Sequence, residues 1–117
     1  MTVAEAGTRY GQALAAERFC PGGRLTASAR ALHGSRTDSD RATFDREAAK
    51  IVESWTAALS CLEADPATGR PIASCRRIKM LSCRQAWLEI GPEGTMRPGL
   101  LEQSLDGVGP DGITRQK

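Results

Sequence analysis

Residues 37–91, TDSDRATFDREAAKIVESWTAALSCLEADPATGRPIASCRRIKMLSCRQAWLEIG, hold two amphipathic segments, a turn between them and three of the four cysteines. In the first segment, apolar residues recur at steps of three and four, as they do on one face of an α-helix. They are Phe44, Ala48, Ile51, Trp55, Leu59 and Leu62, with Val52 and Ala58 beside them. The pattern predicts a helix over residues 41–64. Pro66 ends it, because proline disfavours the helical conformation at the residue before it.

The second segment predicts a helix over residues 74–90. Its apolar stripe consists of Met80, Cys83, Trp87 and Ile90, with Ile78, Leu81 and Ala86 beside it. Gly91 stands where a left-handed C-terminal cap belongs, and Pro92 prevents the helix from continuing. With residues 65–71 as the turn, the two segments predict an antiparallel helical hairpin at the centre of the fold.

The four cysteines predict two disulfides, since an even number of cysteines in a short chain with a small core is typical of a cross-linked scaffold. Cys75 and Cys83 are eight residues apart, which is about 12 Å along a helix and too far for a bond. In the predicted hairpin, Cys61 faces the region of Cys75. We therefore expect the pairs Cys61–Cys75 and Cys20–Cys83.

Two alternatives for the cysteines stay open at the level of sequence. One is a zinc site formed by three cysteines with Cys20 or His33, although the spacings lack the close pair of cysteines that structural zinc usually has. The other is a set of free or redox-active thiols, although no C-x-x-C motif is present. His33 is the only histidine, so a metal centre with two histidines is excluded within one chain.

The remainder of the chain predicts a small all-α domain of three to four helices. Thr2 and Glu5 fit a capping box that begins an N-terminal helix, in which Gly7 and Gly11 would allow another helix to approach closely. A short helix over residues 26–33 follows, and residues 100–105 contain three leucines that fit one further helical turn. We expect one domain over residues 1–105 and a flexible tail over 106–117, which is rich in glycine.

The hydrophobic core of this domain is expected to be thin. Leu, Ile, Val and Phe together account for 20 of the 117 residues, which is at the low end for a packed globule. Much of the remaining apolar content is alanine, which buries little area. A core of this size generally needs disulfides, a metal or a partner to stabilise it.

The compartment follows from the cysteines. Disulfides persist in oxidising environments, so we expect a periplasmic or secreted protein whose signal peptide has been removed, with a cytoplasmic location as the alternative. No secretory signal is visible after Met1, and no segment reaches the roughly 20 apolar residues of a membrane span. The usage of Ala, Arg and Gly resembles that of small exported proteins from high-GC bacteria.

The second segment also carries a concentration of positive charge. Arg76, Arg77, Lys79 and Arg84 lie on it, and no acidic residue occurs between Pro71 and Leu88 although the net charge of the chain is only +2. These four side chains are the candidate partner-binding residues, and they would favour an acidic protein partner. Nucleic acid is disfavoured as a partner, because no aromatic residues alternate with the cations and no recognised motif is present. A homo-oligomer stays open.

No catalytic constellation is present in the sequence, and we expect no enzyme activity, cofactor or metal. The hypothesis that follows is a non-enzymatic, exported helical binding or adaptor module that engages a protein partner. The alternative is a cytosolic regulatory module with a cysteine-ligated zinc, which would bind nucleic acid through the basic helix.

Overall fold

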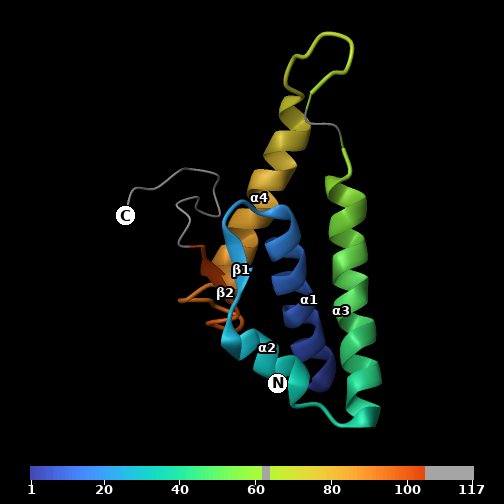
Figure 1. Ribbon diagram of the computed structural model, residues 1–117, viewed down its shortest axis with the longest axis vertical. Helices are drawn as coiled ribbons and strands as arrows, with labels where there is room; N and C mark the ends of the chain where they lie inside the picture. The colour runs from blue at the N-terminus through green and yellow to red at the C-terminus, as the bar shows by residue number, and fades with distance from the viewer. Residues whose placement is uncertain (62–63, 105–117) are drawn as a thin grey trace.

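The computed structural model describes residues 1–61 and 64–104 and is mostly helical (Figure 1). Its elements in chain order are α1 (Val3–Phe19), β1 (Gly23–Leu25), α2 (Ala27–Gly34), α3 (Asp38–Leu59), α4 (Ala73–Ile90) and β2 (Leu101–Gln103). The predominantly helical class is confirmed. The domain is not purely all-α, however, because β1 and β2 form a two-stranded antiparallel sheet. Leu62 and the expected tail over residues 106–117 lie outside the described residues.

Helix α1 occupies the centre that was expected for the pair α3–α4. It lies between α3 and α4 and packs along α3, whereas α3 and α4 touch each other only slightly (Figure 1). The expected central hairpin is therefore not confirmed. The two helices point in opposite directions, but α1 separates them along much of their length.

Two glycines explain the close packing of α1 on α3. A Cβ atom at Gly7 would lie 2.5 Å from the Phe44 carbonyl oxygen, and one at Gly11 would lie 2.5 Å from that of Ala48. Both distances are far below van der Waals contact, so only glycine permits this separation of the backbones. The close approach predicted for these glycines is confirmed, and its register shows that α1 and α3 run parallel.

Two disulfides cross-link the helices, and their pairings are the two expected from helix geometry. Cys20, which follows α1, is bonded to Cys83 of α4 with a Cα–Cα distance of 5.6 Å. Cys61, two residues beyond α3, is bonded to Cys75 of α4 with a Cα–Cα distance of 5.8 Å. The first bond therefore ties α4 to α1, and the second ties the end of α3 to the first turn of α4.

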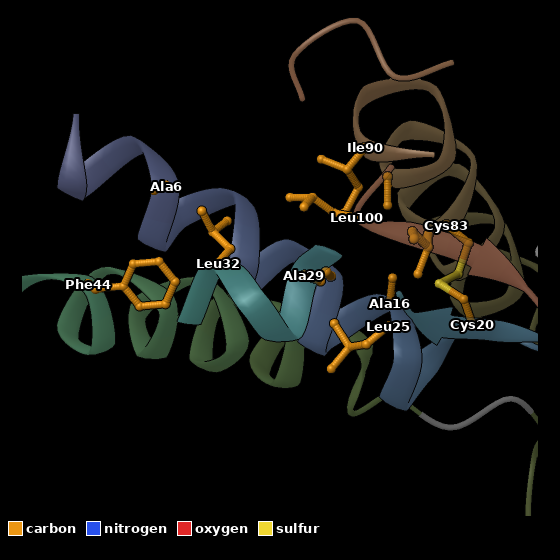
Figure 2. Packing of buried hydrophobic residues seen from close by; sticks show 13 residues of the cluster. Ala6, Ala16, Cys20, Leu25, Ala29, Leu32, Phe44, Cys83, Ile90 and Leu100 are labelled. Carbon is orange, nitrogen blue, oxygen red and sulfur yellow. A yellow bond between two sulfur atoms is a disulfide. The ribbon is translucent and has the colours of Figure 1, made fainter. Parts of the chain in front are cut away.

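The core contains many small side chains. Figure 2 shows the buried residues of α1 and α2 meeting Phe44 of α3 at one end and the Cys20–Cys83 bond at the other. The cluster comprises Ala6, Ala13, Ala16, Cys20, Leu25, Ala29, Leu32, Phe44, Cys83, Ala86, Ile90, Leu100 and Leu101. With so little large apolar area in the core, the disulfides carry part of the stability.

The stripe predicted for α3 is buried only in its first half. Phe44 and Ala48 are 0% and 5% exposed, whereas Ile51, Trp55 and Leu59 are half-buried. For Leu59 the reason is the length of α1. Since Gly11 meets Ala48 and α1 ends eight residues later at Phe19, the last turn of α3 has no helix across from it. Helix α3 also ends at Leu59, earlier than the predicted residue 64.

Residues 91–100 fold back over the end of α4 and supply the hydrogen bonds that its last turn lacks. The backbone amides of Thr95, Met96 and Leu100 donate hydrogen bonds to the carbonyl oxygens of Leu88, Glu89 and Ile90, respectively. Each N···O distance is 3.0 Å. The last carbonyls of α4 are thereby satisfied. We refer to residues 91–100 as the strap.

Two predictions for this region are wrong. Gly91 has φ −70° and ψ −170°, so it is extended and not a left-handed cap. It must be glycine because a Cβ atom would collide with the Trp87 carbonyl oxygen. The expected helical turn of leucines is replaced by β2, in which Leu101 pairs with Leu25. Both leucines are buried, and a paired strand of three residues is too short to leave an alternating pattern in the sequence.

Candidate binding surface on helix α4

The two disulfides determine which side of α4 faces the core. Cys75 and Cys83 both point to their partner sulfurs, and Ala86 and Ile90 continue the same buried side. The sequence analysis placed three larger apolar residues on or beside this stripe. That placement is wrong, because Ile78, Met80 and Leu81 are 44%, 51% and 49% exposed. Turning α4 to bring both cysteines inward turns those three side chains outward.

A polar cluster holds the last turns of α4 against α1. The Glu89 carboxylate accepts hydrogen bonds from Arg9 Nη1 and Gln12 Nε2, each with an N···O distance of 2.9 Å. It accepts a third from Gln85 Nε2, with an N···O distance of 2.5 Å. Burial alone would raise the pKa of Glu89, but the hydrogen bonds from Gln12 and Gln85 and the Arg9 charge outweigh it and lower that pKa. Gln12 is 7% exposed, and its side-chain oxygen and nitrogen both form hydrogen bonds in this cluster, to Arg9 and Glu89. Helix α4 is thus held in one orientation.

The side of α4 opposite the core presents alternating arginine and leucine. Arg77, Leu81, Arg84 and Leu88 follow one another at steps of four, three and four, so they line one side of the helix. All four residues are exposed. We call these four residues the outward face of α4.

Exposed apolar side chains of the described residues are concentrated near this face. The large ones are Met1, Ile78, Met80, Leu81, Leu88 and Met96. Four of these six belong to α4 and one to the strap. The remaining one, Met1, also reaches the strap, since its sulfur is 3.4 Å from Arg97 Nη1. A concentration of exposed apolar side chains ringed by charge is typical of an interaction surface.

Three of the four predicted binding residues lie at the surface. Arg76, Arg77 and Arg84 are exposed on α4, whereas Lys79 is half-buried and in helical register with Cys75 on the core-facing side. Sequence reasoning missed Leu81 and Leu88 as surface residues. The spacing of these leucines with Arg77 and Arg84 was visible in the sequence, but the prediction for this helix rested on the apolar stripe that includes Met80.

A shallow hollow lies at the C-terminal end of the outward face. It is lined by Trp87, Leu88, Pro92, Glu93 and Thr95 and has a volume of about 380 Å³. Trp87 is half-buried and supplies an aromatic wall. The hollow therefore offers room for one large apolar side chain beside the exposed Leu88.

The other candidate groups are engaged within the fold. All four cysteines are in disulfides, so no thiolate is available for the zinc site or the cysteine chemistry left open by the sequence. His33 stacks on Tyr10 with ring centroids 5.1 Å apart, and its Nε2 lies 3.2 Å from Asp45 Oδ1. Within residues 1–61 and 64–104, no group of three or more His, Cys, Asp or Glu side chains could hold a metal ion.

Comparison with known proteins adds no assignment. No protein-family model matches the chain, and no curated protein or solved structure matches it. Among the described residues, none of the helices combines the length and apolar character that crossing a membrane requires.

Proposed function

We propose that this protein is a non-enzymatic, exported helical adaptor module that engages an acidic protein partner through the outward face of α4. The observation that carries this proposal is the alternation of Arg77, Leu81, Arg84 and Leu88, all exposed, on the side of α4 that points away from the core. An interface needs apolar area to bury and charges that select the partner. This face offers both.

The exported location is supported by the two disulfides, which persist in an oxidising compartment such as the periplasm or the extracellular space. The alternative of a cytosolic zinc module lacks its ligands once the four sulfurs are paired with one another. A protein partner for the basic helix, which was the first hypothesis from the sequence, is therefore preferred.

The test is capture of partners from the exported fraction of the native host with three forms of the protein. These are the wild type, the double variant Arg77→Glu/Arg84→Glu and the matched control Arg41→Glu/Arg46→Glu on α3, which changes the net charge equally. All four arginines are exposed, so folding should be retained, as circular dichroism would check. We expect a protein that wild type and control recover and the α4 variant loses.

Equal recovery of every protein by all three forms would contradict the proposal, and so would a wild type that captures nothing. Retention of DNA or RNA that weakens steeply between 50 and 200 mM salt would instead support nucleic acid as the partner.

A further inference from the structure

We infer that the partner element is an acidic amphipathic helix that lies along the outward face of α4 and places a large apolar side chain in the hollow beside Leu88. This inference rests on the proposed function and names the partner's chemistry. It follows from the spacing, the charge and the shape of the surface.

The spacing of the outward face is that of a helix-to-helix contact. From Arg77 to Leu88 the face spans 12 residues, whose 11 steps along the helix cover about 16 Å or three helical turns. A partner helix with apolar and acidic residues at steps of three and four would place leucine against leucine and carboxylate against arginine at each turn. An extended strand would place its side chains at a different period.

The charge of the face selects an acidic partner. Arg77 and Arg84 form no ion pair with another residue within the described ranges, and the stretch between Pro71 and Leu88 contains no carboxylate. Each guanidinium therefore has donors available for a bidentate contact with Asp or Glu. Two copies of this face would bring four arginines into one interface with no carboxylate on either face to pair with them, which disfavours a second copy of the chain as the occupant.

The arrangement of charge also disfavours a lipid surface. A helix that lies in a membrane interface separates its apolar residues onto one side and its cations onto the other. Here Arg77 and Arg84 alternate with Leu81 and Leu88 along the same line, so inserting the leucines would bring both arginines into the apolar layer. A protein helix can place one carboxylate against each arginine, so this pattern fits a protein helix.

The hollow fixes how the partner helix is oriented. Its rim includes Glu93, which would repel a carboxylate, whereas Trp87 and Leu88 favour an apolar side chain. The apolar anchor of the partner thus lies at the hollow beside the strap, and its carboxylates lie along the helix against Arg77 and Arg84. A buried apolar anchor surrounded by charge pairs is the arrangement in which a few residues supply most of the binding energy.

The experiment is a selection from a displayed library of 18-residue helical peptides with randomised surface positions, using the disulfide-bonded wild type as bait. Binding of the best selected peptide is then measured by fluorescence anisotropy against wild type, Arg84→Glu, Leu88→Ser and the control Arg46→Glu. We expect selected peptides in which Asp or Glu alternates with apolar residues at steps of three and four, with Leu, Phe or Trp at the position that enters the hollow. Arg84→Glu and Leu88→Ser should each weaken binding about tenfold or more, and Arg46→Glu should leave it unchanged.

The contrary outcomes separate this inference from the proposed function. A selection without acidic and apolar enrichment, or peptides that bind all variants equally, overturns the inference. If the α4 double variant still loses the native partner in that case, the proposed function stands and only the helical partner is rejected. Stronger binding to phosphatidylglycerol vesicles than to any selected peptide would overturn the inference in favour of a lipid surface.

Discussion

At the scale of single residues, two glycines set the distance between the two helices that pack most extensively. Gly7 and Gly11 lie one turn apart on α1, and each faces a backbone carbonyl of α3. Glycine costs helix stability relative to alanine, by up to about 1 kcal/mol at each position. The close packing of α1 on α3 offsets this cost, because any Cβ atom at these positions would push α3 away.

Replacing Gly11 with alanine should therefore destabilise the protein by about 1–3 kcal/mol, since the overlap with Ala48 exceeds the gain in helix propensity. Gly34→Ala is the matched control, because nothing lies within 4 Å of a Cβ atom at that position and the backbone is not left-handed. The control should be unchanged or more stable by up to about 1 kcal/mol. Urea unfolding with both disulfides intact measures the difference, and equal losses in both variants would argue against the close helix contact.

Glu89 gives a prediction for pH. Its pKa in the folded state lies below the ordinary value of 4.5, so its contribution to stability is present above that value and is lost as the pH falls through the folded pKa. The free energy of unfolding of wild type should fall below about pH 4.5 relative to that of Glu89→Gln, whose amide does not titrate. Parallel curves for the two proteins between pH 2.5 and 7 would show that the cluster with Arg9 and Gln12 does not form.

At the scale of elements, the orientation of α4 follows from two disulfides that differ in their exposure to solvent. Cys20 and Cys83 are 5% and 2% exposed and belong to the core. Cys61 is an exposed residue, although its partner Cys75 is buried. The Cys61–Cys75 disulfide closes the short segment between the end of α3 and the start of α4, away from the buried core cluster.

The exposed bond should be reduced first. A thiolate of dithiothreitol attacks a sulfur that it can reach, here that of Cys61, and Cys75 leaves as a thiolate before the reagent's second thiol completes the exchange. Brief treatment followed by iodoacetamide and peptide mapping should show Cys61 and Cys75 labelled while Cys20 and Cys83 are still bonded. Earlier labelling of Cys20 and Cys83 would contradict the burial described here.

At the scale of the whole molecule, a core of small side chains is cross-linked where its helices would otherwise separate. The Cys20–Cys83 bond spans 63 residues and joins the first and last helices, whereas Cys61–Cys75 spans 14. In the chain-entropy model a long closed loop stabilises the folded state more than a short one does. The long bond also fills space in the core.

The variant Cys20→Ala/Cys83→Ala should therefore lose about 4 kcal/mol or more, and Cys61→Ala/Cys75→Ala about 3 kcal/mol. Against a total of about 5–15 kcal/mol, the first loss is a large share of the stability, and the variant is expected to unfold at a lower temperature. Thermal unfolding followed by circular dichroism compares the two. A larger loss for the Cys61 and Cys75 pair would show that the core does not depend on the long cross-link.

Local patterns in the sequence determined the helices and the cross-links. The capping box of Thr2 and Glu5 begins α1 as predicted, and Gly11 predicted a close helix contact. Distance along one helix excluded a bond between Cys75 and Cys83. The expected turn over residues 65–71, which brings Cys61 to Cys75, chose between the two pairings that remained. Each of these features depends on residues near in sequence or on a rule that one helix imposes by itself.

The tertiary structure alone decided which helix is central, which side of α4 is buried and where a strand replaces a helical turn. The predicted stripe put Met80 on one side of α4 with Cys83 and Ile90, but Leu81 and Leu88 also recur at helical spacing, so periodicity could not choose which side is buried. The choice required the positions of Cys20 and Cys61, which lie on other elements. Likewise, Leu101 forms a strand only because Leu25 lies beside it, and a pairing across 76 residues leaves no local signal in a segment of three residues.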